Sequence, residues 1–143
     1  MLGQQIVSIL QYFHFKDFIH NQIMPNNFIL GSGEKQDKLY LVDFCAAMRY
    51  RDDKTNEHKS ENKSNEPRTV NLEFSSVRYN KGEVVSRRDD MESVLYVMLF
   101  MLKRELPWSK FATNSKKSKS ERARKVLKIK ESIKEETLFA GYP

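Results

Sequence analysis

The residues best suited to chemistry lie in the stretch FIHNQIMPNNF, which runs from Phe18 to Phe28. It contains His20 and Asn27, seven positions apart, and Asp43 follows after two short apolar segments. Amide and carboxylate oxygens are the kind of ligand that a hard divalent cation accepts. Between His20 and Asn27, however, the chain carries no acid or base. The spacing indicates a catalytic loop in which neutral side chains replace the groups that would move a proton.

The neighbouring segments must position this loop. Apolar side chains recur at helical spacing in residues 4–18, which predicts an amphipathic helix with one buried face. Residues 28–30 and 39–42 are short apolar runs, separated by the turn residues of segment 31–35. We expect these runs to pair as a hairpin that ends at Asp43.

The second half of the chain predicts two further helices. Ser86 and Asp89 match a capping box, with Asp in place of the usual Glu. Residues 91–102 are apolar on nearly every face, which predicts a buried helix at the centre of the domain. Residues 115–136 predict a lysine-rich helix with a sparse apolar stripe. The charged run 51–68 predicts a mobile loop.

Composition limits the function classes. The 143 residues suffice for one domain, and the single cysteine, Cys45, excludes an internal disulfide and favours a reducing compartment. No secretory signal is evident, and the longest apolar run, residues 94–102, is too short to cross a bilayer. These features predict an intracellular protein, cytoplasmic or nuclear, without a membrane partner.

The net charge of +6 has two interpretations. Lysines and arginines gather in residues 116–125, where they form either a phosphate-binding surface or nuclear address, or simply the solvated face of a helix. Nucleic acid is an unlikely partner, because the sequence contains no recognition motif beyond charge.

Together the motifs resemble the casein kinase I family of serine/threonine protein kinases. The most family-specific piece is SRRDDMES, residues 86–93. The resemblance covers almost the whole chain, and its other matching pieces are Phe18–His20, Pro25, Asn27–Phe28, Gly31, Leu41–Phe44, Tyr50–Asp52, Leu106–Trp108 and Gly141–Pro143.

The resemblance implies a mainly α fold with a small β-hairpin. Residues 1–143 would form part of the large, C-terminal lobe of a protein kinase, and the small lobe is expected to be absent, because no G-x-G-x-x-G loop or strand lysine is found. We therefore expect exposed apolar surface beside the helix at 91–102 and on the face against which a small lobe would pack.

The resemblance also assigns catalytic roles. In protein kinases an aspartate of the catalytic loop accepts the proton of the substrate hydroxyl, and in this family a loop lysine steadies the transferred phosphoryl group. Gln22 and Met24 occupy those positions here and are predicted to be non-functional. Asn27 and Asp43 correspond to magnesium ligands and are interpreted as vestigial metal positions.

Two further residues have structural roles by the same resemblance. His20 corresponds to a residue packed into the core. Asp90 corresponds to an anchor for the backbone of the catalytic loop; an acid favoured by the dipole at the start of a helix is the simpler explanation, and both can hold.

The sequence thus predicts a casein kinase I-like homologue that is inactive, either a pseudokinase or a truncated fragment, and that acts by binding a protein partner. No cofactor is expected, and Mg-ATP would be required only if the family activity persists. One alternative is a serine/threonine kinase active only within a longer chain. A second is a basic nucleic-acid-binding protein.

Overall fold

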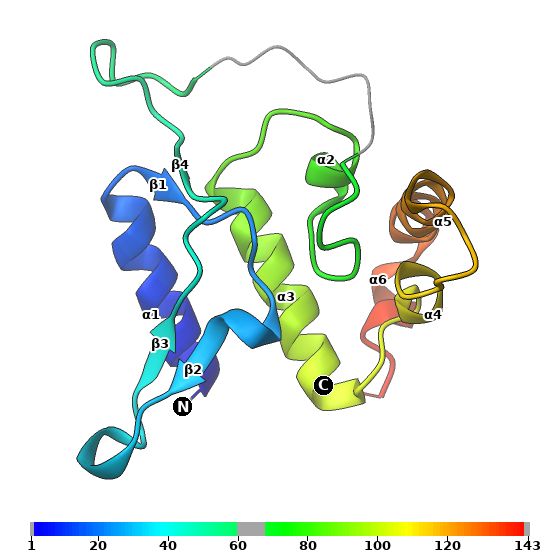
Figure 1. The fold of residues 1–143 in the computed structure, drawn as a ribbon, viewed down its shortest axis with the longest axis horizontal. Coiled ribbons are helices and arrows are strands. Elements are labelled where there is room, and N and C mark those ends of the chain that lie inside the picture. Colours follow the sequence, from blue (N-terminus) through cyan, green and yellow to red (C-terminus); the bar gives the residue numbers. More distant parts are fainter. Residues whose placement is uncertain (1, 60–67, 142–143) are drawn as a thin grey trace.

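The computed structural model describes residues 2–59 and 68–141. Helices dominate, and two small antiparallel sheets of two strands each accompany them (Figure 1). In chain order the elements are α1 (Leu2–Phe15), β1 (Phe18–Ile19), the 3-10 turn η1 (Pro25–Asn27), β2 (Phe28–Leu30), the 3-10 turn η2 (Gly33–Lys35), β3 (Leu39–Leu41), β4 (Met48–Arg49), α2 (Val77–Asn80), α3 (Arg87–Lys103), α4 (Ser109–Ala112), α5 (Lys119–Ser132) and α6 (Glu135–Leu138).

Helix α1 confirms the predicted amphipathic helix. Its buried stripe consists of Ile6, Leu10 and His14, which are spaced four residues apart and therefore lie on one face. The helix ends at Phe15, earlier than expected, because Asp17 adopts a left-handed conformation with φ of 66° and turns the chain into β1.

The predicted hairpin is also confirmed. Strand β2 pairs antiparallel with β3, and Phe28 lies opposite Leu41. At its turn, a Cβ atom on Gly31 would lie 2.2 Å from the carbonyl oxygen of Lys35, so only glycine fits this position.

A second sheet was not predicted. Strands β1 and β4 pair antiparallel, with Phe18 opposite Arg49 and Ile19 opposite Met48. Each strand has only two residues, too few to show an alternating pattern, so the expectation of a single hairpin was incomplete.

Helix α3 is the central element, but it is not buried on every side. The predicted capping box of Ser86 and Asp89 is confirmed. Contacts with α1 and α2 bury residues such as Val94, Val97 and Leu99. The third side is open and exposes Met91, Leu95 and Leu102, the last by 60%. This open side agrees with the exposed apolar surface expected beside the helix at 91–102.

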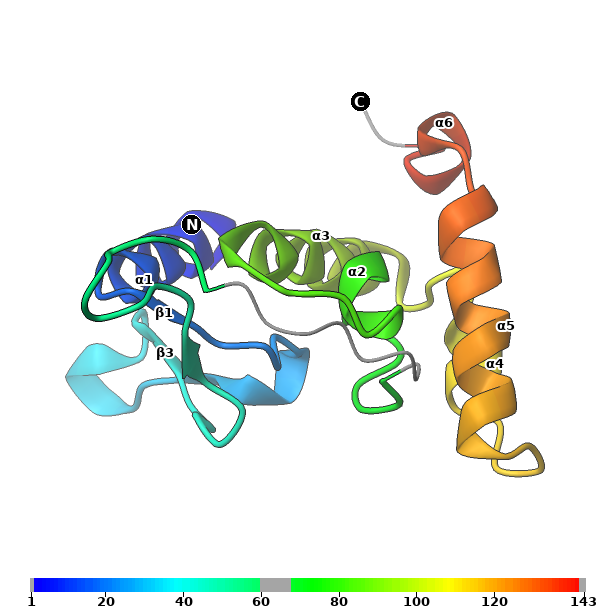
Figure 2. The same ribbon diagram turned by 90° about the horizontal axis from the view of Figure 1, so that it is seen from above.

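Helix α5 runs crosswise to α3 at the far end of the molecule (Figure 2). It begins at a capping box of Ser118 and Glu121 and buries Ala123, Val126 and Lys130. The helix predicted over residues 115–136 is shorter in the structure, because Ile133 adopts an extended conformation and separates α5 from α6.

Exposed apolar side chains also gather at the hairpin. Ile29, Leu30 and Tyr40 are each at least 44% exposed, and Phe44 beyond β3 is 50% exposed. Exposed apolar surface was expected, and it is found both here and on α3. In the described part of the chain, no helix is long and apolar enough to cross a membrane.

The predicted mobile loop is described only in part. Residues 51–59 form turns closed by a bridge between Arg51 and His58. Residues 60–67 of the predicted loop lie outside the described residues.

Candidate functional site

The backbone of the loop between β1 and β2 is held by one buried carboxylate. Asp90 lies in the first turn of α3, where the capping box fixes its position, and is 2% exposed. Its Oδ2 accepts a hydrogen bond from the His20 backbone N–H at 2.8 Å, and its Oδ1 accepts one from the Asn21 N–H at 2.9 Å. Asp90 thus contacts the loop backbone and also lies in the first turn of a helix. The two interpretations from the sequence, an anchor for the loop and an acid favoured by the helix dipole, therefore both apply.

His14 completes the surroundings of Asp90. Its Nε2 lies 2.9 Å from Asp90 Oδ2, so α1 joins the loop and α3 at this point. Sequence reasoning did not select His14. The signal was present, because His14 continues the buried stripe of Ile6 and Leu10.

His20 is fully buried and links the loop to the end of the hairpin. Its Nε2 lies 3.2 Å from the carbonyl oxygen of Val42, so this nitrogen must carry the hydrogen. The ring packs against Phe13 and Phe44. Burial lowers the pKa of His20, although the charge of Asp90 acts in the opposite direction, so the imidazole is neutral at physiological pH.

Asn27 is buried and makes contacts at both ends of the loop. Its Nδ2 donates to the backbone carbonyl of Gln22 at 2.8 Å. Its backbone carbonyl accepts from the N–H of Val42 at 2.9 Å, which places the loop beside the end of β3. The side-chain oxygen of Asn27 is the atom available for a metal ion.

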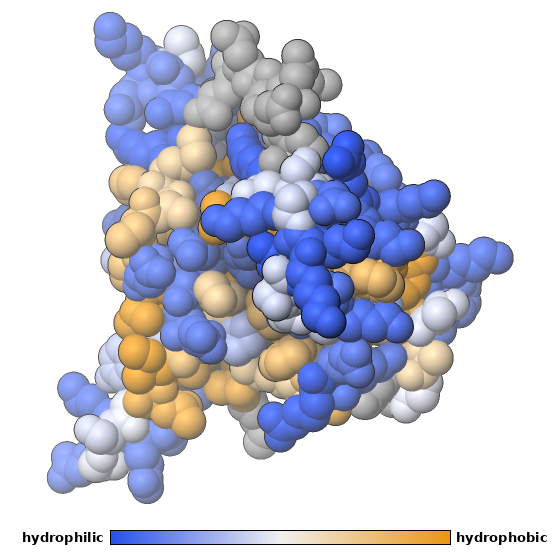
Figure 3. Space-filling view, turned by 45° about the vertical axis from the view of Figure 1, so that its right-hand side comes forward, coloured by the Kyte–Doolittle hydropathy of each residue, from blue (hydrophilic) through white to orange (hydrophobic). Residues whose placement is uncertain are grey.

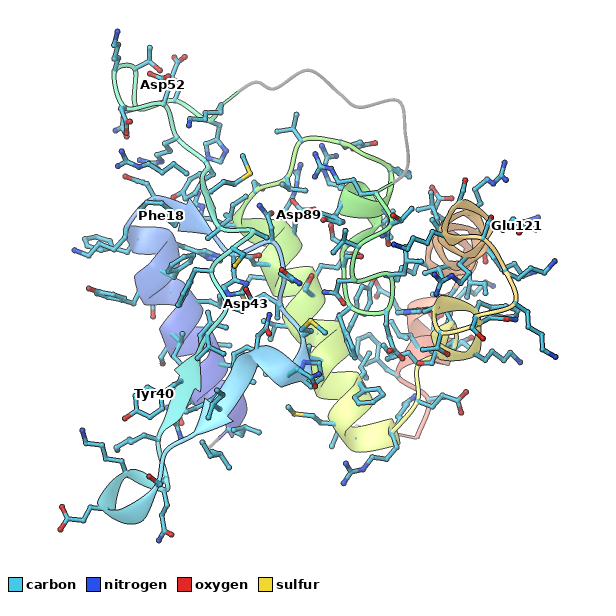
Figure 4. The ribbon with its side chains drawn as sticks, in the orientation of Figure 1. Phe18, Tyr40, Asp43, Asp52, Asp89 and Glu121 are labelled. Carbon is cyan, nitrogen blue, oxygen red and sulfur yellow. The ribbon has the colours of Figure 1, made fainter. Side chains whose placement is uncertain are left out.

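Asp43 is exposed and lies near the middle of the molecule in front of α3 (Figure 4). Its φ of 63° turns the chain sharply after β3. Its Oδ1 lies 3.4 Å from the backbone N–H of Cys45. The neighbouring carboxylate raises the pKa of the Cys45 thiol, chiefly by accepting its hydrogen bond, so Cys45 does not have the thiolate character of a reactive cysteine.

Gln22 and Met24, which the sequence predicts to lie at the positions of the general base and the lysine, are both half-buried. The backbone between them is held by Asn71, whose Nδ2 donates to the carbonyl of Ile23 at 3.1 Å. Met24 lines a hollow of about 250 Å³ together with Glu73 and Arg122. The Glu73 carboxylate accepts a hydrogen bond from the Ser109 hydroxyl there.

The acids of SRRDDMES have different targets. The Ser76 hydroxyl, at the start of α2, donates to Asp89 Oδ1 at 2.7 Å. The N–H of Val77 donates to Glu92 Oε1 at 2.8 Å. Asp90 contacts the loop between β1 and β2 instead. One helical turn of α3 therefore fixes both the loop and α2.

The described residues offer magnesium only a partial site. Within residues 2–59 and 68–141, no three His, Cys, Asp or Glu side chains gather to hold a metal ion. Asn27 and Asp43 supply one oxygen-bearing side chain each. Magnesium is usually held by one or two carboxylates together with phosphates and water, so these residues fit Mg²⁺ only in the company of a phosphate-bearing ligand.

The family assignment agrees with this geometry. The sequence model of a family described as fungal protein kinase matches residues 4–102, more than half of the chain. The chain belongs to the fungal protein kinase family. The match includes most of α1, the loop at 20–27, Asp43 and almost all of α3. The kinase-like character predicted from the motifs is confirmed at the level of this family. Helices α4, α5 and α6 lie outside the matched residues.

Proposed function

We propose that this member of the fungal protein kinase family does not transfer phosphate as the present chain and acts by binding a protein partner. One contrast carries the proposal. Asp90 and Asn27 hold the loop backbone through hydrogen bonds of 2.8–2.9 Å, whereas the side chains at the chemical positions, Gln22 and Met24, carry no charge. The backbone of the loop is held in place, but the loop lacks the charged side chains that phosphoryl transfer would require.

The expected loss of rate is large. A side-chain amide cannot accept a proton at neutral pH, and a positioned general base contributes about 10²–10⁴ in rate. Met24 supplies no cation beside the negative charge that develops on a phosphoryl group, and electrostatic contributions of this kind are worth roughly 3–4 kcal/mol. The two losses act on one transition state, so they are not simply additive.

Within the family, the motifs favour a casein kinase I-like relative. The run SRRDDMES carries this finer assignment, since three of its acids occupy the contacts described above. Active relatives of that type phosphorylate proteins, and a shared surface without catalysis would make this chain a scaffold or a competitor for their partners.

A transfer assay tests the proposal. The purified chain is incubated with Mg-ATP and casein, and labelled phosphate in the casein is measured against a mock preparation. We expect no difference. Turnover that is lost in Asp43→Ala, a change at an exposed residue, would overturn the proposal, because it would show that the inherited metal position supports chemistry in this chain.

A competition assay tests the binding role. An active casein kinase I and a protein substrate are mixed with increasing amounts of the chain, and the initial rate is measured. We expect the rate to fall without label appearing on the chain. A rate unchanged at a large excess of the chain would contradict a role as competitor.

A kinase active only within a longer chain remains the second candidate. The retained loop backbone and the oxygen donors of Asn27 and Asp43 favour it. It predicts that the native gene product, isolated from its own cell, phosphorylates casein although the present chain does not. It also predicts that Gln22→Asp in that product raises the rate.

A further inference from the structure

Helices α4 and α5 form a concave basic surface that the proposed function does not use. The hollow has a volume of about 490 Å³ and is lined by Phe111, Asn114, Lys117, Glu121, Arg122, Arg124, Lys125 and Lys128. We name it the basic groove. It contains five cationic side chains and one acid. Figure 3, in which the side of the molecule carrying α5 comes forward, shows mainly hydrophilic side chains there.

The register of α5 creates the groove. The capping box at Ser118 starts the helix, so Glu121, Arg124, Lys125 and Lys128 follow at intervals of three and four residues and share one face. The opposite face buries Ala123, Val126 and Lys130. Because this face is packed into the core, the orientation of the helix is fixed and its charged face stays at the groove.

The single acid of the groove is already engaged. Glu121 Oε2 accepts the Ser118 backbone N–H at 3.1 Å, and Oε1 lies 3.5 Å from Lys117 Nζ. Figure 4 shows Glu121 at the edge of the molecule, far from Asp43. Glu121 therefore offsets the charge of one lysine and leaves the others uncompensated.

Among the described residues, three of the remaining cations have no acidic partner. In the part of the chain that the structure describes, no carboxylate forms an ion pair with Arg124, Lys125 or Lys128. Arg124 and Lys128 are four residues apart, a spacing at which like charges repel on a helix. Lys125 lies 5.3 Å from the centre of the Phe111 ring, which holds it at the groove. A bound anion would relieve this repulsion.

Arg122 gives the groove a fixed wall. Its guanidinium donates to the Ala112 backbone carbonyl at 2.9 Å, which ties α5 to the end of α4. Arg122 also lines the groove, and a planar guanidinium suits phosphate oxygens. The groove therefore combines one anchored arginine with four exposed cations.

We propose that the basic groove binds a small ligand that carries several phosphate groups on a compact scaffold. Its volume lies within the usual range for small-ligand sites, and arginine and lysine are the side chains that bind phosphate. A free inositol polyphosphate and a phosphoinositide headgroup share this chemistry. Nucleic acid fits less well, because Lys110 and Lys125 both already lie over the Phe111 ring, where a base would have to stack.

The test uses inositol hexakisphosphate as the probe, with binding measured by calorimetry at about 0.15 M ionic strength. The double variant Arg124→Ala, Lys128→Ala removes two exposed groove cations. Its matched control, Lys116→Ala, Lys119→Ala, removes the same charge from exposed positions outside the groove. Circular dichroism checks that both variants keep the helical content of the parent chain.

We expect the groove variant to bind about tenfold more weakly or worse, and the control to stay within about twofold of the parent. Equal weakening in both variants would overturn the proposal, since it would mean diffuse attraction by net charge. Undetectable binding by the parent would overturn it too.

Two further arms identify the source of the phosphates. Vesicles with and without phosphatylinositol bisphosphate are sedimented with the chain, and soluble probe is added as a competitor. Binding that requires the bisphosphate and is displaced by the probe supports a lipid headgroup, whereas tight binding of the probe without vesicle binding supports a free ligand. Single-stranded DNA that binds as tightly as the probe, with no loss in the groove variant, would contradict the proposal. None of these outcomes depends on phosphoryl transfer.

Discussion

Asp90 and Lys130 hold the two sides of the molecule by opposite means. Asp90 is a buried anion that accepts hydrogen bonds from two backbone N–H groups of the loop between β1 and β2. Lys130 is a buried amine whose Nζ donates to the carbonyls of Leu72 and Ser75, at 2.9 and 2.5 Å, and to Asn80 Oδ1 at 3.1 Å. Asp90 accepts hydrogen bonds from backbone donors, whereas Lys130 donates hydrogen bonds to oxygen acceptors.

The two groups differ in what compensates their burial. Asp90 has His14 beside it, at the start of a helix whose dipole favours an anion. Lys130 has neutral oxygens and the rings of Tyr96 and Trp108, at 5.0 and 5.1 Å, but no carboxylate in ion-pair contact within the described residues. Burial consequently lowers the pKa of Lys130 to about 7, and the charges of Glu92 and Glu73 oppose this only in part.

The comparison shows that a buried ionisable side chain can hold several backbone segments together without an oppositely charged partner in contact. Its pKa then shifts toward neutral pH, as it does for Lys130. On the Asp90 side the helix supplies part of the compensation. On the Lys130 side the same burial leaves an amine that is poised to lose its proton.

The largest expected effect comes from Asp90→Ala. The change leaves the N–H groups of His20 and Asn21 and the ring of His14 without their shared acceptor in a buried site. We expect a loss of roughly 3–5 kcal/mol in the free energy of unfolding, measured by urea denaturation. Asp90→Asn, which keeps one acceptor oxygen, serves as the intermediate case. A change below about 1 kcal/mol in the alanine variant would show that the loop is held by other contacts.

The second effect concerns pH and Lys130. Its pKa is about 7 in the folded state, below the ordinary value of 10.5, so between these values the unfolded chain binds more protons. Lys130 therefore makes stability rise with pH from about 7 toward 10.5, by at most roughly 1.4 kcal/mol for each pH unit. Below pH 7 its contribution to the slope vanishes. The measurement is urea denaturation at pH 7, 8 and 9.

The control for this slope is a pair of methionine substitutions. Lys130→Met removes the titrating group and should flatten the rise. Lys81→Met removes an exposed lysine that pairs with Glu131 and should leave the rise in place. A slope that persists in Lys130→Met would assign the pH dependence to other groups.

The smallest effect is that of His14→Ala. Asp90 keeps both backbone donors in this variant, so we expect a loss of about 1–2 kcal/mol in the free energy of unfolding. The exposed His58→Ala is the matched control and should change stability by less than about 0.5 kcal/mol. A loss as large as that of Asp90→Ala would mean that the contact with His14, rather than the backbone donors, dominates the site.

The sequence determined the elements whose signals are local. Helical spacing predicted α1, turn residues between apolar runs predicted the β2–β3 hairpin, and Ser86 with Asp89 predicted the start of α3. The motif spacing also selected the loop positions Gln22 and Asn27. The predictions of α1, of the hairpin and of the start of α3 are confirmed, because each depends on residues within a few positions of one another.

Tertiary structure alone decided the long-range contacts. The pairing of β1 with β4, the packing of His14 against Asp90 and the seating of Lys130 among the carbonyls of segment 72–80 join residues far apart in the chain. A lysine within a lysine-rich helix gives no sign that it is buried, since its surroundings come from other segments. Local patterns therefore determined the helices, the hairpin and the uncharged side chains of the loop at 20–27. The packing of segments that are distant in the chain determined which charged side chains are buried.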